Sequence, residues 1–391
     1  MRLEALDGGD AGAVSAALEA ALDGTRPLAL GFTPGAGDVV PEGTAAVIAT
    51  SGSTGVPKRV VLSAAALRAS AAATAQRIGS GQWLLALSAG YVAGLQVLVR
   101  AHLAGTEPAL LEGRFTPASF VAAGDGLGPG PRYTSLVPAQ LATLLDAAGD
   151  PDVRRVLGSF EAVLIGGQAL PPALRERAAD LGVRIVRTYG SSETAGGCVY
   201  DGVPLDGVRV AAVDGEIRLS GPTLADGYLR DDELTARTFV ADATGARWYR
   251  TGDAGTVADG RVAVTGRIDN VIVSGGVNVS LDRVERAVRT VPGLEGAVVV
   301  AVDDARWGQG SAIVAARAAD PAAPAASGPV ARGALLAAAR DRVADEVGAA
   351  ARPGRLLLLD ELPLLSSGKP DRRAIAALAA AHAVADTSPG G

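Results

Sequence analysis

Short apolar runs that end at a glycine-rich polar loop, and are then followed by a helical stretch, recur along the first half of the chain. Ala45–Thr50 reads as such a strand, and Ala64–Ile78 reads as the helix after it. Ala162–Ile165 ends at two glycines, and a helix over Pro171–Leu181 follows. This alternation is typical of parallel strands joined by helical crossovers, so it predicts an α/β architecture.

The pattern changes in the second half of the chain. From about residue 203, short strands such as Glu216–Ser220 alternate with turns, which indicates a mostly antiparallel region. After Gly266 a small α+β unit follows, with a helix near Leu281–Val291 and a strand at Arg355–Leu359. We therefore predict a large N-terminal domain of mixed sheets with helices, residues 1–268, and a small α+β C-terminal domain, residues 269–391.

Composition and charge exclude several classes of protein. With 48% hydrophobic and 20% charged residues, the 391-residue chain can bury a sizeable core, which excludes a disordered or collagen-like protein. A formal net charge of −6 gives no support to nucleic-acid binding. No stretch approaches the roughly 18 apolar residues of a membrane-spanning helix, and the start is too acidic for a signal peptide. We expect a cytoplasmic protein without stable membrane insertion.

Lysine is almost absent from the chain. Lysine and arginine together number 36, and only Lys58 and Lys369 are lysine. A guanidinium does not imitate a compact ammonium on a flexible stem, so a lysine that persists in so arginine-rich a chain indicates a chemical requirement. Chance is the alternative explanation for two such residues.

The first glycine-rich loop has the composition of a polyphosphate site. Glycines expose backbone N–H groups, hydroxyls add donors and a lysine adds positive charge. Pro57 stands where a Walker A loop requires glycine, so this is not a Walker A loop. A flexible loop without a ligand is the alternative. The candidate phosphate ligands are Thr50, Ser51, Gly52, Ser53, Thr54, Gly55 and Lys58.

A second polar loop, YGSSET over residues 189–194, follows a strand directly. Open α/β sheets bind ligands at the carboxyl ends of their strands. Tyr189 can stack on a purine, Thr194 can donate to a phosphate, and Glu193 can hold Mg²⁺. An N-capping turn is the alternative for this loop taken alone.

Three later loops each present one charged side chain. Asp253, in YRTGD, can accept both hydroxyls of a ribose. Asp269 falls where the sequence pattern changes and is the candidate hinge between the domains. Lys369 lies in a flexible loop near the C-terminus. A polar hairpin end explains Asp253 equally well, and a solvated surface charge is the alternative for Lys369.

In their order and spacing, these stretches resemble the adenylate-forming superfamily of acyl- and aryl-CoA ligases, adenylation domains and luciferases. TSGSTGVPK resembles the family's phosphate loop, IGGQAL its adenine-side loop, and YGSSET its adenine and Mg²⁺ motif. YRTGD resembles the ribose motif, GRIDNVIVSGG the hinge motif, and SSGKPDR the segment with the catalytic lysine. The resemblance implies that family's fold, with a shortened N-terminus and a mobile C-terminal domain.

The resemblance also implies a role for each candidate residue. Lys369 would bridge the acid and the α-phosphate, Thr194 would bind the α-phosphate, and Glu193 would hold Mg²⁺. The other implied residues are Gly167, Gln168, Tyr189 and Gly190 for adenine, Asp253 and Arg267 for ribose, Gly275 and Gly276 for the coenzyme A arm, Asp269 as the hinge, and Tyr91, Gly166, Ser191 and Arg100 for the acid. A surface helix arginine is the alternative for Arg100.

Three further stretches are similar to ligases that act on 2-succinylbenzoate in menaquinone biosynthesis: TYGSSETAGGCVYDGVPLDGV, GPTLADGY and YVAGLQVLVRAHLAGTEP. The implied reaction uses ATP, Mg²⁺ and coenzyme A, and relatives are commonly homodimers. Three alternatives remain: a CoA ligase for another aryl or small acyl acid, an adenylation enzyme that loads a carrier protein, and a nucleotide-binding regulator without catalysis. The regulator is disfavoured, because the charged residues of every motif are present.

Overall fold

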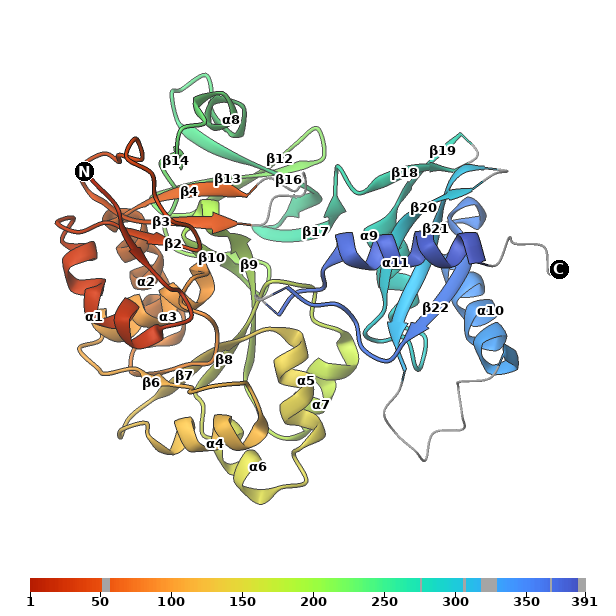
Figure 1. The fold of residues 1–391 in the computed structure, drawn as a ribbon, viewed down its shortest axis with the longest axis horizontal. Helices are drawn as coiled ribbons and strands as arrows, with labels where there is room; N and C mark the ends of the chain where they lie inside the picture. Colours follow the sequence, from red (N-terminus) through yellow and green to blue (C-terminus); the bar gives the residue numbers. More distant parts are fainter. Residues whose placement is uncertain (51–56, 275, 305–306, 318–328, 366–367, 386–391) are drawn as a thin grey trace. The chain divides into compact units, whose positions relative to one another are not determined.

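The computed structural model describes residues 1–50, 57–274, 276–304, 307–317, 329–365 and 368–385, and it divides into two compact units (Figure 1). The N-terminal unit comprises Met1–Thr251 and Val257–Ala263, and the C-terminal unit comprises Gly252–Thr256 and Val264–Gly391. The predicted α/β class, with a larger N-terminal and a smaller C-terminal part, is confirmed. The domain boundary between residues 268 and 269 stays a prediction.

Two sheets organise the N-terminal unit. The first sheet contains, in spatial order, β1 (Glu4–Leu6), β2 (Leu28–Leu30), β3 (Thr44–Thr50), β4 (Lys58–Ser63) and β14 (Gly227–Tyr228). The second contains β11 (Val203–Pro204), β10 (Gly196–Tyr200), β9 (Ile185–Ser191), β8 (Ala162–Ile165), β7 (Arg132–Leu136), β5 (Gln82–Leu85) and β6 (Ala109–Leu110). The strands from β9 to β6 are parallel, as predicted.

Helices cover both faces of the second sheet (Figure 1). One hydrophobic core joins both sheets to α1 (Ala11–Leu22), α2 (Ala64–Ile78) and α3 (Val92–Leu103). A second core lies under α4 (Pro117–Asp125), α5 (Pro138–Asp146), α6 (Pro151–Gly158) and α7 (Pro172–Asp180). Helix α2 has its predicted bounds because the Ser63 side chain accepts the Ala66 N–H at its start, and Gly79, at φ 99°, follows its end.

A third, antiparallel sheet follows. It contains β12 (Arg209–Val213), β13 (Glu216–Ser220), β16 (Arg247–Ala258) and β15 (Phe239–Ala241), with β17 (Arg261–Arg267) beside β16 and α8 (Asp232–Thr238) before β15. This agrees with the antiparallel region predicted from about residue 203.

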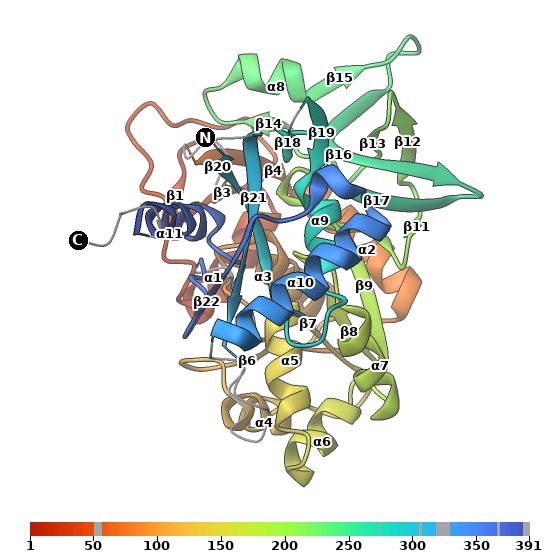
Figure 2. The same ribbon diagram turned by 90° about the vertical axis from the view of Figure 1, so that its right-hand side faces the viewer.

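The sheet of the C-terminal unit is covered on both faces. It contains β19 (Val277–Ser280), β18 (Val271–Ser274), β21 (Gly308–Ala316) and β20 (Val298–Asp304), with β22 (Arg355–Leu359) beside β21. Successive residues of β20 face opposite sides, so Val299 packs with α9 (Leu281–Val288) and α10 (Pro329–Glu346), whereas Val298 and Val300 pack with α11 (Arg372–Ala385). Figure 2 shows α10 and α11 on opposite sides of these strands.

Four predicted loops are wholly or partly strand. The phosphate loop does not lead straight into α2, because Lys58–Ser63 forms β4, whose Val60 and Leu62 are buried. The first three residues of YGSSET extend β9, and YRTGD lies inside β16. In the hinge motif, residues 271–274 form β18. In each place backbone pairing with a neighbouring strand overrides the turn propensity of glycine, serine and aspartate.

Among the residues that the structure describes, no helix is long and apolar enough to cross a membrane.

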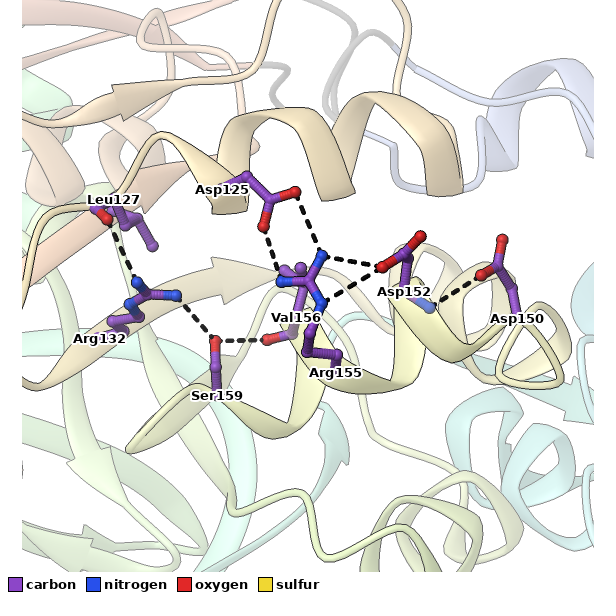
Figure 3. A network of polar contacts seen from close by, with 8 residues as sticks. All are labelled: Asp125, Leu127, Arg132, Asp150, Asp152, Arg155, Val156 and Ser159. Atoms are coloured by element: carbon purple, nitrogen blue, oxygen red, sulfur yellow. Dashed lines mark hydrogen bonds and ion pairs between the residues drawn. The ribbon is translucent and has the colours of Figure 1, made fainter.

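Helices α4 and α6 are joined by polar contacts at the surface (Figure 3). The Arg155 guanidinium donates to both oxygens of Asp125, at 2.8 and 3.2 Å, and to Asp152 at 3.0 Å. Gly124 lets the helices approach closely, since a Cβ there would lie 2.3 Å from a methyl carbon of Val156. The hydrogen bond from Arg155 lowers the pKa of Asp125 below its ordinary value.

Replacing Arg155 with methionine should lower the urea midpoint of unfolding at neutral pH and change it less in acid. A depressed carboxyl pKa stabilises the folded state above the unfolded pKa, and this contribution is lost as pH falls through the folded pKa. Urea titrations of both proteins between about pH 7 and about pH 3 measure the difference. A midpoint difference that is the same at both ends would contradict the expectation.

Candidate active site

The hairpin of β3 and β4 holds the two ends of the predicted phosphate loop. Thr50 and Lys58 are paired across the antiparallel strands, and the Thr50 hydroxyl donates to the Lys58 carbonyl oxygen at 3.3 Å. Five candidate phosphate ligands lie outside the described residues, and their role stays a prediction: Ser51, Gly52, Ser53, Thr54 and Gly55. The hairpin thus places a lysine directly at the end of this loop.

Tyr228 on β14 contacts both Lys58 and Glu193. Its hydroxyl donates to Oε1 of Glu193 at 2.8 Å, and Nζ of Lys58 lies 5.7 Å from its ring centroid. Burial, and then the neighbouring carboxylate, raise the pKa of Tyr228, so its phenol keeps the proton and remains a donor. This tyrosine therefore connects the phosphate loop with the YGSSET turn. We did not predict it as a site residue, although it lies in the stretch GPTLADGY.

The YGSSET segment closes as a capped turn. A single 3-10 turn, η1 (Ser192–Thr194), connects β9 with β10. The buried Thr194 hydroxyl accepts the Ser191 N–H at 2.9 Å and donates to the Gly196 carbonyl oxygen at 2.8 Å. This is the capping turn that we named as the alternative. The contact of Thr194 with a phosphate stays a prediction.

The carboxyl ends of β8 and β9 bring the predicted adenine residues to one edge of the second sheet. Residues 166–168 follow β8, and residues 189–191 end β9. A Cβ on Gly166 would lie 2.5 Å from Oγ1 of Thr188, and a Cβ on Gly190 would lie 2.2 Å from a carbonyl oxygen of β10. The approach of the two backbones requires glycine at position 190, whereas a side chain at position 166 would displace the Thr188 hydroxyl. Nucleotides bind at such an edge in open α/β sheets.

Helix α3 contributes two residues predicted to contact the acid. Tyr91 is half-buried at the position before the helix. The loop ahead of it is held by the N-terminal segment, because the Gly90 N–H donates to the Gly8 carbonyl oxygen at 3.1 Å. A Cβ on Gly8 would lie 2.2 Å from Cα of Gly90. Gln96 ties the helix to the YGSSET turn, since its amide donates to the Ala195 carbonyl oxygen at 2.8 Å.

Arg100, one turn further along α3, is only 7% exposed, so the alternative of a surface arginine is wrong. Its Nη2 donates to the Tyr200 hydroxyl at 3.4 Å, and its guanidinium carbon lies 5.1 Å from the ring centroid of Trp83. Burial lowers the pKa of Arg100. Within the described part of the chain its Nε has no hydrogen-bond partner and no carboxylate forms an ion pair with it. Arg100 is therefore a buried cation without a counter-ion there.

In the C-terminal unit, Arg267 joins the predicted ribose and hinge residues. Its Nε and Nη2 contact the two carboxylate oxygens of Asp269 at 2.9 and 3.0 Å, and its Nη1 contacts Asp253 at 3.1 Å. The hydrogen bond to Asp269 is the main cause that raises the pKa of Arg267. These residues therefore form one charged cluster, although Asp253 comes from β16 and not from a loop after a turn.

The last predicted residues lie in two turns of the C-terminal unit. Gly276, with φ 83°, is exposed between β18 and β19, and Gly275 lies outside the described residues. Lys369 lies in a short hairpin, where its carbonyl oxygen accepts the Leu365 N–H at 2.8 Å. The roles of these residues stay predictions.

Comparison with known proteins agrees with this arrangement. The family model described as AMP-binding enzyme matches residues 9–229, and the one described as AMP-binding enzyme C-terminal domain matches residues 283–369. A Mycobacterium tuberculosis protein named "Probable 2-succinylbenzoate--CoA ligase" is 40% identical over 346 residues, which cover 87% of this chain and 85% of that protein. The Escherichia coli 2-succinylbenzoate--CoA ligase is 33% identical over 270 residues, 66% of this chain and 55% of that protein.

Two solved structures extend the comparison. An Escherichia coli MenE variant with bound OSB-AMS is 27% identical with a TM-score of 0.68, and the match covers 90% of this chain and 72% of that one. The Bacillus subtilis o-succinylbenzoate CoA synthetase (MenE), in complex with the acyl-adenylate intermediate OSB-AMP, is 25% identical with a TM-score of 0.70, over 85% of this chain and 69% of that one. The resemblance predicted from the motifs is confirmed: this chain belongs to the AMP-binding enzyme family, the adenylate-forming superfamily.

Proposed function

We propose that this chain activates 2-succinylbenzoate with ATP as an acyl-adenylate and transfers the acyl group to coenzyme A, with release of AMP and pyrophosphate. Relatives at 40% and 33% identity carry the name of this activity, and the similar MenE structures hold OSB-AMS and OSB-AMP. In this chain, the choice of acid rests on the charge of Arg100, which is buried and has no counter-ion among the described residues.

Arg100 favours an acid with a second carboxylate. A buried cation without a counter-ion is costly, and a carboxylate that accepts from a guanidinium recovers much of this cost. 2-Succinylbenzoate keeps its ring carboxylate free while the carboxylate at the end of its keto chain is activated. The free carboxylate would accept from Nε of Arg100, the donor that lacks a partner among the described residues.

The first half-reaction makes the acid electrophilic. A carboxylate oxygen attacks the α-phosphorus of ATP, the bond from that phosphorus to the bridging oxygen breaks, and pyrophosphate leaves with the electron pair. Two anions approach each other in this step, so cations and oriented donors must offset their repulsion. Lys369 would bridge the carboxylate and the α-phosphate, and the loop from Thr50 to Lys58 would hold the β- and γ-phosphates.

The nucleotide would bind at the edge formed by β8 and β9. Tyr189 would stack on adenine, with Gly167 and Gln168 at its other side, and Asp253 with Arg267 would hold the ribose. Ser191 and Gly166 would line the path of the acid beside Tyr91. The proximity of the β8 and β9 ends supports the adenine part of this assignment.

Glu193 is suited to bind a magnesium ion whose other ligands come from the substrate phosphates and from water. Among the described residues, no group of three or more histidine, cysteine, aspartate or glutamate side chains could form an all-protein site. Mg²⁺ commonly takes one or two carboxylates together with substrate phosphates and waters. Glu193, held by the Tyr228 hydroxyl at 2.8 Å, is such a carboxylate. The ion, when bound, would neutralise phosphate charge.

In the second half-reaction the thiol sulfur of coenzyme A attacks the acyl carbon. The bond from this carbon to the adenylate oxygen breaks, AMP leaves, and the thiol proton passes to solvent. The glycines at residues 275–276 would allow the thin pantetheine arm to pass close to the backbone. Coenzyme A as acceptor, the cytoplasmic location and the homodimer remain predictions.

Replacing Arg100 with methionine should raise the KM for 2-succinylbenzoate by roughly tenfold to a hundredfold. This change corresponds to the loss of one hydrogen bond to a charged group, which is worth about 1.5–3 kcal/mol. The KM for ATP should stay unchanged. Pyrophosphate release measures both constants. An analogue without the ring carboxylate should bind the wild type and the variant alike.

The matched control is Arg77→Met on α2, where the guanidinium donates to backbone carbonyl oxygens of β11 and not to the proposed pocket. A KM for the diacid that stays at the wild-type value in the Arg100 variant would contradict the assignment.

A panel of acids tests the function as a whole. The full chain is incubated with ATP, Mg²⁺ and each acid, with and without coenzyme A, and pyrophosphate, hydroxamate and thioester are measured. We expect 2-succinylbenzoate to be preferred and to give a thioester only with coenzyme A. Preference for a monocarboxylic aryl or acyl acid would indicate a different CoA ligase, and acyl-adenylate without thioester would indicate an enzyme that loads a carrier protein.

A further inference from the structure

The C-terminal unit holds a buried carboxylate, Glu285 of α9, which is 6% exposed. Its Oε2 accepts the Val299 N–H of β20 at 2.9 Å. Two arginines also reach this carboxylate: Arg289 contacts Oε1 at 2.9 Å, and Arg372 contacts both oxygens, at 2.8 and 2.7 Å. Such a carboxylate is fixed in place, because each contact is charge-assisted or involves the backbone of a sheet.

The two arginines serve different parts of the chain. Arg289 follows α9 and donates to the Ala297 carbonyl oxygen at 2.7 Å, so it stabilises the connection between α9 and β20. Arg372 is the first residue of α11 and also donates to the Val299 carbonyl oxygen at 3.1 Å. Arg372 therefore attaches the start of α11 to both α9 and β20.

The segment that Arg372 attaches is the hairpin that carries Lys369. Leu364 and Pro370 form an antiparallel bridge, and the Asp371 N–H donates to the Pro363 carbonyl oxygen at 2.8 Å. Lys369 thus lies one residue beyond the bridge and three residues before Arg372. The hairpin is short and hydrogen-bonded across its base, so its orientation is set where its base is attached.

We propose that Arg372, held by Glu285, is a positioning residue that orients the Lys369 hairpin for adenylation. This inference rests on the proposed function, which assigns Lys369 to the first half-reaction. The Arg372 guanidinium is planar, and its Nη2 holds the Glu285 carboxylate while its Nη1 holds the Val299 carbonyl oxygen, so both its position and its direction are fixed, which a single contact cannot do. A misplacement of about 1 Å at a reacting group costs up to about a hundredfold in rate, although Arg372 itself touches no substrate.

The site offers a matched control. In Arg372→Met the second arginine still neutralises Glu285, so no buried charge is left alone. In Arg289→Met the two contacts of Arg372 Nη2 with Glu285 remain, and the hairpin keeps its attachment. Both variants remove one arginine from the same carboxylate, but only one of them releases the lysine hairpin.

The experiment measures the two half-reactions of the full chain separately: pyrophosphate release from ATP and acid, and thioester formation from supplied acyl-adenylate. Arg372→Met should slow the first by about tenfold or more and leave the second within about twofold. Arg289→Met should lower the melting temperature and leave both half-reactions within about twofold. Arg372→Lys should recover part of the adenylation rate at most, since it keeps the charge but loses the second nitrogen, which holds the Val299 carbonyl oxygen.

A double variant separates positioning from folding. If Arg372 acts through Lys369, adding Arg372→Met to Lys369→Ala should change pyrophosphate release by less than about twofold. Equal losses in both half-reactions, additive losses in the double variant, or an unchanged adenylation rate in Arg372→Met would each overturn the inference. Normal adenylation in Lys369→Ala alone would overturn the lysine assignment of the proposed function, and the positioning role would fall with it.

Discussion

Replacing Lys369 with alanine is expected to slow pyrophosphate release about a hundredfold, and to leave thioester formation from supplied acyl-adenylate within about twofold. The ammonium would lie between two anions as they approach, and one charge-assisted contact in a partly dry site is worth on the order of 3 kcal/mol. Lys369→Arg should recover little, because a guanidinium needs more room and a different geometry. Rapid quenching with labelled ATP measures the first rate.

Arg373→Ala is the matched control for this prediction. Arg373 is exposed, carries the same charge and lies in the same chain segment, at the start of α11. Its removal should change neither half-reaction. If Lys369→Ala releases pyrophosphate at the wild-type rate, the lysine is a solvated surface charge, the alternative that its sequence setting left open.

Replacing Asp269 with proline should have the opposite selectivity: adenylation within about threefold of the wild type, and thioester formation slowed by about a hundredfold. A hinge residue absorbs a change in its backbone angles, and proline fixes φ near −65° and restricts the preceding residue as well. Single-turnover formation of the thioester from supplied acyl-adenylate measures the affected step.

The Asp269→Ala variant separates the effect of the backbone from the effect of the side chain. It removes the two contacts with Arg267, at 2.9 and 3.0 Å, and keeps the backbone free to rotate. Thioester formation should therefore survive in the alanine variant. Similar losses in both variants would assign the effect to the Arg267 cluster, and similar losses in both half-reactions would remove the hinge role.

Helices and buried strands with a clear apolar pattern could be predicted closely from the sequence. Ala64–Ile78, Ala162–Ile165 and Arg355–Leu359 have their predicted bounds. Strand β4 was missed because it begins with Lys58 and Arg59, whose charges hide a strand that is buried only from Val60 onward. Strand β16 contains YRTGD, which we predicted as a loop, because pairing along the strand is a tertiary property that this motif does not encode.

The motifs predicted the family. The burial and the contacts of single residues, in contrast, could be learned only from the structure. The position of Arg100 on a helix could be predicted. Its burial depends on Trp83 and Tyr200, which come from the strands β5 and β10. Tyr228 had no signal of its own, because its contact with Glu193 joins segments that are far apart in the sequence. Spacing along the chain reveals motifs, but contacts between strands determine which side chain faces which.

The contact of Gly8 with Gly90 has a practical consequence for anyone who prepares this enzyme. The N-terminal segment is far from every motif along the sequence, yet its Gly8 carbonyl oxygen holds the loop that leads into Tyr91 and α3. A purification tag fused there, or a deletion made to improve crystals, would act on the loop before Tyr91, the residue that we propose beside the acid. Changes in acid selectivity would then follow from handling of the terminus, and a tag at the opposite end is the safer choice.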